Sequence, residues 1–409
     1  MSLDPRAHYE ERSKSRARDA EALENRSRVI GSLRLLCVAV AIGALGAGAW
    51  AHLPDKSVAW AAFALAVIAF AVLVVVHGRI IHRKDRALAA RDFNDRGLAR
   101  LDGTWHKLPF AADVKAAPNH PFAGDLDIYG ESSLFHFVDR AETRFGRVHL
   151  ASWLGGGFGA FPDDVRARQG AIRELAGKTA FRETLSSLGA VLGEAKPDPA
   201  PMIAWSEGST ALTFPVFMPL LTKVLPLLTV GAIVFHSHLP KLVWLGCLVL
   251  QLVLVTPLRA GVRAVLDAAS SREGALTAYG EMLETIEKET LASPMLASLH
   301  AKIAGSTVAM GELRRILALV DARHNEVFRL FISPVLLWEY NSAFALEKWR
   351  KKYGARVRVW VDVLGQIEAL SSLAAVAFEQ PAFTWPELAA DTRLEGKALG
   401  HPLLAADKR

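Results

Sequence analysis

The sequence predicts an all-α membrane protein in which two transmembrane helical hairpins are joined to a body of long helices. Two observations predict this fold class. Four apolar segments occur as two adjacent pairs, and outside them the apolar residues recur in steps of three and four. Such steps place residues on one face of an α-helix. No stretch shows the sustained alternation that is typical of a β-strand.

The composition agrees with this class. Hydrophobic residues make up 51% of the 409 residues, yet 22% are charged, which fits a chain whose apolar residues are gathered in blocks. The formal net charge of +6 suits an anionic membrane surface or a nucleic acid and selects neither. Cys37 and Cys247 both lie in apolar segments, which argues against a disulfide framework and a cysteine metal site.

The first hairpin is predicted at residues 35–78, after a polar N-terminal arm at residues 1–34. Its two apolar runs, 35–53 and 58–77, each have about 20 residues, enough to cross the ~30 Å hydrocarbon core of a bilayer. The link between them contains a single basic residue, Lys56. Both outer flanks are rich in basic residues: Arg34, Arg79, Arg83, Lys84, Arg86 and Arg91. The excess of positive charge predicts that both ends of the hairpin are cytoplasmic.

The second hairpin is predicted at residues 205–258, beyond a basic linker at 79–124. Residues 242–258 form an uninterrupted apolar run, but the run before it contains Lys223 and three prolines. That first half is either a kinked span or an interfacial helix followed by a short span. We interpret Lys223 as a residue at the membrane edge rather than in a transport site.

The body is predicted at residues 125–204 and 259–380, with a connector at 381–409. Three periodic apolar series indicate long amphipathic helices that pack on one another. The series are Leu276, Tyr279, Leu283 and Ile286; Leu313, Ile316, Val320, Val327 and Phe331; and Val357, Trp360, Leu364, Ile367 and Leu370.

Few residues suggest chemistry. Gly177-Lys178-Thr179 resembles the end of a phosphate-binding loop, but Ile172 stands where that loop needs its first glycine. His236 and His238 have no third metal ligand nearby, and no catalytic residues or metal site are expected. One basic run is either a nucleic-acid contact or a solvated helix face: Lys348, Arg350, Lys351, Lys352, Arg356 and Arg358.

Residues 125–154, DLDIYGESSLFHFVDRAETRFGRVHLASWL, resemble the opening of the core, or lever, region of MutS-type mismatch-repair proteins. A second similarity is to the element that precedes the MutS ATPase domain. The residues that carry these two resemblances are Gly130, Ser133, Leu134, Phe135, Thr143, Gly146, Leu150, Trp153 and Leu154, and His401 and Pro402.

The resemblance implies a membrane-anchored lever module, non-catalytic alone, that couples an ATPase domain to DNA or another partner. It also implies the family's roles in DNA mismatch repair, mismatched-DNA binding and ATP binding. ATP and Mg²⁺ are expected only with the ATPase domain, in cis or in trans, since no Walker loop occurs in these residues. A homodimer in the bacterial cytoplasmic membrane, with both termini in the cytoplasm, is expected.

This chain departs from the MutS pattern in two places. The second hairpin stands where MutS proteins insert their DNA clamp, and Phe181-Arg182-Glu183 matches a mismatch-reading wedge in letters alone. Two alternatives therefore stay open. One is a membrane scaffold or dimerisation protein with no nucleic-acid role. The other is a transporter that uses Lys223 and Gln251.

Overall fold

The computed structural model divides the chain into two compact units. Unit 1 comprises Met1–Val138, Leu175–Val191 and Leu373–Arg409, and unit 2 comprises Asp139–Glu174 and Leu192–Ser372. The structure describes residues 4–50, 56–110, 120–156, 162–191, 200–208, 215, 217–240, 242–270, 273–321, 326, 328–388 and 395–404. Throughout these ranges the regular structure is helical and contains no β-strand, which confirms the all-α class. Parts of the predicted hairpin links, of residues 205–217 and of the connector lie outside the described residues.

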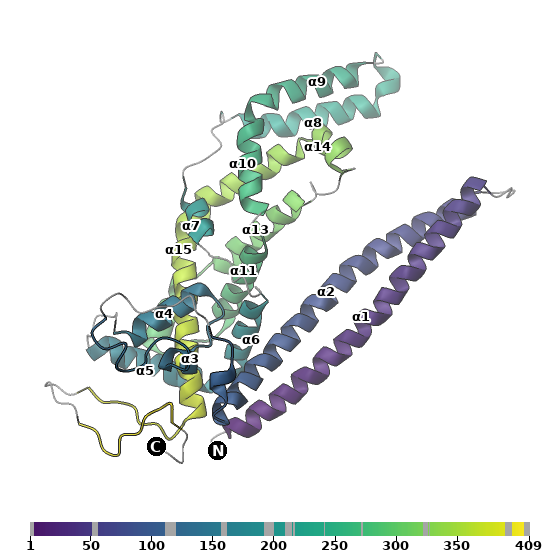
Figure 1. Ribbon diagram of the computed structural model, residues 1–409. Helices are drawn as coiled ribbons and strands as arrows, with labels where there is room; N and C mark the ends of the chain where they lie inside the picture. Colours follow the sequence, from purple (N-terminus) through teal and green to yellow (C-terminus); the bar gives the residue numbers. More distant parts are fainter. Residues whose placement is uncertain are drawn as a thin grey trace. The chain divides into compact units, whose positions relative to one another are not determined.

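Two long helices dominate unit 1. Helices α1 (Pro5–Trp50) and α2 (Ser57–Leu101) lie side by side as an antiparallel pair (Figure 1). From Pro5 to Trp50 the predicted polar arm and the first apolar run are therefore one continuous helix, and α2 continues well into the predicted linker. Ion pairs join the polar halves of the two helices, such as Lys84 to Glu24 at 2.9 Å and Arg6 to Asp102 at 2.6 Å.

Among the described residues, four helices are long and apolar enough to cross a membrane, and one of them differs from the rest in its burial. The apolar windows of α1 and α2 are 0% and 11% buried within the protein, and that of Val243–Ala268 is 17% buried. The window in α15 (Trp338–Glu379) is 61% buried. The first three thus expose apolar surface of the kind that a bilayer covers, whereas the apolar face of α15 packs against the protein core.

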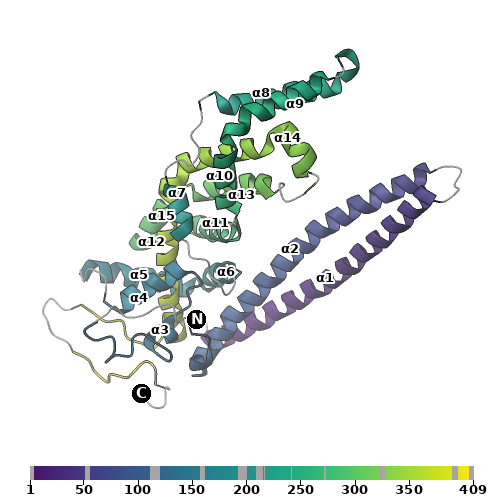
Figure 2. The same ribbon diagram turned by 45° about the horizontal axis from the view of Figure 1, so that its top comes forward.

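The second apolar hairpin belongs to unit 2. It consists of α8 (Met218–Val234) and α9 (Val243–Val255), which lie side by side (Figure 2), and continues through a 3₁₀ turn (Thr256–Leu258) into α10 (Arg259–Ser270). The 17 residues of α8 extend about 25 Å, less than the ~30 Å of a typical hydrocarbon core. Lys223 is exposed on α8, and its interpretation as a residue at the membrane edge stays a prediction.

A third apolar element packs on this hairpin, and the sequence did not reveal it. A π-helical turn (Phe328–Ile332) leads into α14 (Ser333–Leu336), which contacts both α8 and α9. Leu330 and Phe331 are 69% and 65% exposed. In the second predicted series, Leu313 and Val320 on α13 (Ser306–Asp321) are buried, Val327 lies outside the described residues, and Phe331 is exposed in the π-helical turn.

Buried polar side chains of the second apolar hairpin form hydrogen bonds with one another and with backbone carbonyls. The Gln251 side chain is fully buried; its amide donates to the carbonyls of Pro334 and Val335 at 2.8 and 3.1 Å, and its oxygen accepts from Thr229 at 2.9 Å. Asn341 similarly donates to the Thr222 carbonyl at 3.1 Å. In an apolar environment such bonds hold segments together. These contacts give Gln251 a structural role.

Replacing Gln251 with leucine is expected to lower stability by about 1–3 kcal/mol, because two buried carbonyls lose their donor. Thermal unfolding of the full chain in detergent measures the effect. The control is Val249→Leu, a change at a residue 53% exposed on the same helix. Equal unfolding temperatures for the two variants would contradict the structural role.

The remaining helices of unit 2 pack around α15. They are α4 (Arg144–Leu154), α5 (Pro162–Gly177), α7 (Ala200–Glu207), α11 (Glu273–Lys288), α12 (Pro294–Lys302) and α13. The last residues of α5 and α15 belong to unit 1. The first and third predicted series are confirmed as core: every member, from Leu276 to Ile286 and from Val357 to Leu370, is buried.

Candidate functional site

The first residues of the motif build a tight turn in unit 1. Gly130 has φ +114°, a conformation that disfavours side chains, and the Ser133 hydroxyl donates to its carbonyl at 2.6 Å. Short helix α3 (Leu134–Val138) follows, with Leu134 half-buried and Phe135 1% exposed. These contacts give this part of the motif a structural role in the loop and the core.

The next motif residues surround a buried carboxylate in unit 2. Thr143 caps α4, its hydroxyl accepting from the Gly146 amide at 3.1 Å, and the same hydroxyl bonds to Glu368. Glu368 also accepts from the backbone amides of Glu142 and Thr143 at 3.0 and 3.2 Å. A Cβ on Gly146 would lie 2.7 Å from a Glu368 oxygen, so glycine lets α15 approach.

The pKa of Glu368 is shifted strongly from its usual value. Burial raises the pKa of Glu368 to about 7, although the bonds from Thr143 and the amides act in the opposite direction. Such a shift is a common mark of functional sites, but structural caps show it too. Because its bonds go to a helix N-terminus, we assign Glu368 to the joint between α4 and α15.

The predicted basic run does not form one open stripe on α15. Arg350 is 7% exposed and pairs with Glu347 at 2.8 Å, while Arg358 pairs with Glu207 at 2.6 Å. Further contacts are Arg356 with the Ala304 carbonyl at 2.6 Å and Lys352 with Glu312 at 3.5 Å. Lys348 and Lys351 are exposed. Much of the run therefore fastens α15 to its neighbours within unit 2.

The other predicted residues are dispersed. Trp153 lies half-buried under the Arg168 guanidinium, 4.5 Å from its ring centre, and Leu150 is fully buried. His401 is exposed and Pro402 half-buried. Helix α5 ends at Gly177, so Gly177-Lys178-Thr179 follows a helix and does not open one. Within the described ranges no group of three His, Cys, Asp or Glu side chains could hold a metal.

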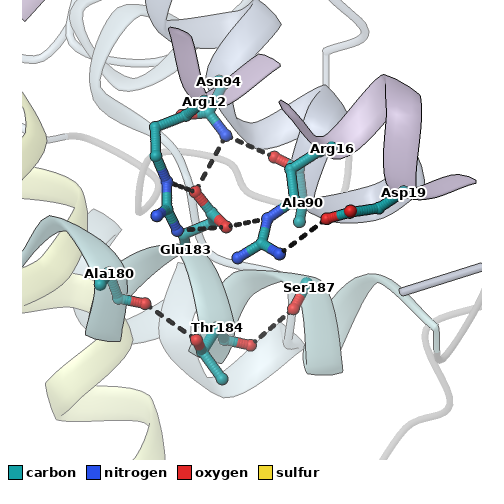
Figure 3. A network of polar contacts seen from close by, with 9 residues as sticks. All are labelled: Arg12, Arg16, Asp19, Ala90, Asn94, Ala180, Glu183, Thr184 and Ser187. Atoms are coloured by element: carbon teal, nitrogen blue, oxygen red, sulfur yellow. Dashed lines mark hydrogen bonds and ion pairs between the residues drawn. The ribbon is translucent and has the colours of Figure 1, made fainter. Parts of the chain in front are cut away.

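A buried ion-pair network in unit 1 was missed by sequence reasoning (Figure 3). Glu183, on α6 (Thr179–Ala190), accepts two bonds from Arg12 at 2.8 Å, one from Arg16 at 2.7 Å and one from Asn94 at 3.0 Å. Its side chain is 2% exposed. Burial raises the pKa of Glu183, but the bonds from Arg12 and Asn94 outweigh burial, so the pKa lies below its usual value. Glu183 is therefore a charged anchor between α6, α1 and α2.

Beside this network lies a cavity of about 430 Å³, bounded by α1, α2 and α6. It is of the size that small ligands occupy in proteins. Six charged side chains line it: Arg16, Asp19, Arg26, Arg83, Arg86 and Glu183. Phe181, Arg182 and Glu183 are thus buried in unit 1, where Arg182 donates to the Leu175 carbonyl at 2.9 Å.

Comparison with known proteins adds no family. The chain matches no protein-family model, and no curated protein or solved structure shows significant similarity to it.

Proposed function

We propose that this chain is a membrane-anchored, non-catalytic coupling module whose helices transmit movement between an ATPase domain and the membrane or another partner. One observation carries the proposal. Helix α2 runs without a break for 45 residues, from an exposed apolar segment to a buried ion pair at its other end. A continuous helix is stiff, so displacement at one end is passed to the other.

The buried end of α2 is firmly attached within unit 1. Arg100 makes two bonds to Glu379, at 2.6 and 3.0 Å, and the Tyr9 hydroxyl donates to the same carboxylate at 3.0 Å. Tyr9 reaches this point because Gly97 has no side chain: a Cβ there would lie 2.6 Å from the Tyr9 ring. Helices α1 and α2 and the end of α15 are thereby clamped together, as transmission requires.

The resemblance of residues 125–154 and of His401 and Pro402 to MutS levers supplies the proposed partner, an ATPase domain in cis or in trans that binds ATP and Mg²⁺. It also supplies the proposed homodimer and the link to mismatch repair. The basic flanks of the first hairpin support cytoplasmic termini in a bacterial inner membrane.

Spin-label distances test the coupling. Labels are placed at Leu88→Cys in unit 1 and Val308→Cys in unit 2, both exposed, after Cys37 and Cys247 are replaced by alanine. In native membranes we expect the distance distribution to change between ATP and ADP. A pair within unit 1, Leu88→Cys with Val29→Cys, is the control that stays constant. An identical distribution in both nucleotides would contradict coupling and favour a static scaffold.

A membrane scaffold with no nucleic-acid role is the second candidate. The observation that favours it is the intrachain pairing of Arg350 and Arg358, which uses charges that DNA would need. Full-length protein in neutral-lipid nanodiscs should then show no DNA binding even at low salt. Binding that falls steeply with salt, and that weakens in a Lys348→Ala, Lys351→Ala variant, would instead support the DNA-contacting module.

A further inference from the structure

The cavity between α1, α2 and α6 has an excess of positive charge on its walls. Four guanidinium groups and two carboxylates line it. Both carboxylates are already neutralised: Glu183 by Arg12 and Arg16, and Asp19 by Arg16 at 3.3 Å. The excess charge therefore rests with the remaining arginines.

Two of these arginines have no hydrogen-bonding or ion-pair partner among the described residues. Arg26 on α1 and Arg83 on α2 make no hydrogen bond or ion pair with any residue in the described ranges, although both line the cavity. Lys84, next to Arg83, bonds to Glu24 at 2.9 Å and holds the two helices together at this level. Two exposed, unpaired guanidinium groups on facing helices thus lie beside one 430 Å³ space.

The cavity lies close to the proposed membrane surface. Arg26 precedes Arg34, the last charge before the first apolar run, by eight residues, or about 12 Å of helix. Arg83 follows His77, the end of the second run, by six residues, or about 9 Å. Extended arginine side chains at these positions can reach the level of lipid phosphates.

We propose that this cavity binds a phosphate group, carried either by the headgroup of an anionic lipid or by a soluble phosphate compound. The planar fork of a guanidinium matches two phosphate oxygens at once, and two such forks on facing helices would hold a phosphate between them. The polar wall formed by α6, with Thr184 and Ser187, leaves room for the rest of a polar headgroup.

The experiment uses the full chain in nanodiscs and two probes. Spin-labelled phosphatidylglycerol, compared with spin-labelled phosphatidylcholine, reports on the lipid source. Inorganic pyrophosphate, titrated calorimetrically into phosphatidylcholine nanodiscs, reports on the soluble source. We expect tight binding of at least one probe, with a loss of about tenfold or more in the Arg26→Gln, Arg83→Gln variant. Neither replaced side chain has a hydrogen bond or ion pair to lose within the described residues, and circular dichroism verifies that the variant folds.

The matched control is Arg28→Gln with Arg79→Gln. It removes the same charge from the same two helices, nearer to the apolar runs, at residues that do not line the cavity. Retention of binding by the control and its loss in the cavity variant support the site, and the probe that binds identifies the source. Equal losses in both variants would show diffuse surface attraction and overturn the proposal, as would the failure of both probes to bind wild-type protein.

Discussion

Replacing Glu379 with alanine is expected to destabilise unit 1 by about 3–5 kcal/mol, because the buried guanidinium of Arg100 loses its ion-pair partner. The Arg100 and Glu379 side chains are 2% and 1% exposed, so solvent cannot replace the lost bonds. The Tyr9 hydroxyl loses its acceptor as well. Denaturant unfolding of the full chain in detergent, followed by circular dichroism, measures the change.

Two further variants serve as controls for this test. Arg96→Ala on the same helix breaks a pair with Asp92 whose side chains are 27% and 56% exposed, and it should cost about 1 kcal/mol or less. The double variant Arg100→Met, Glu379→Leu removes both charges and should recover much of the stability lost by Glu379→Ala. A Glu379→Ala variant no less stable than Arg96→Ala would contradict the clamp at the end of α2.

The second large effect concerns pH. Because burial raises the pKa of Glu368 to about 7 from a usual 4.5, the folded protein holds a proton that the unfolded chain releases. The stabilisation from that proton is complete below pH 4.5 and is lost as the pH rises through about 7. A pKa difference of this size corresponds to about 3 kcal/mol.

Glu368→Gln should therefore flatten the dependence of stability on pH between about 4.5 and 7.5. The amide cannot ionise, and its oxygen can still accept from the amides of Glu142 and Thr143. Unfolding free energies at several pH values give the comparison. Glu326→Gln, at a side chain 87% exposed, is the control and should leave the wild-type slope in place. An unchanged slope in Glu368→Gln would show that Glu368 is ionised throughout.

Local patterns predicted the helical parts of this chain well. The series Val357, Trp360, Leu364 and Ile367 is buried because its spacing alone fixes one face of a helix. The two apolar runs of the first hairpin were also predictable, because their length and composition identify them without any packing partner. The place of Phe331 was not predictable in this way, since it belongs to a π-helical turn that leads into α14, and α14 packs on α8 and α9.

The polar clusters could not be predicted, because their members are far apart in sequence. Arg12 and Glu183 are separated by 171 residues, and Arg100 and Glu379 by 279. Neither member has a local feature that sets it apart from a surface charge. Gln251 was noticed as a polar residue in an apolar run, but its partners are backbone carbonyls, which leave no trace in the sequence.

The shortness of α8 has a consequence for the surrounding lipid. Its 17 residues, about 25 Å, fall below the ~30 Å of a typical bilayer core, while the apolar runs of α1 and α2 match that thickness. In the proposed membrane anchor, acyl chains beside an α8 that spans the bilayer would have to shorten or tilt, at a fraction of a kcal/mol per Å of mismatch. We therefore expect a membrane-inserted second hairpin to thin the bilayer around itself and to favour thin membranes.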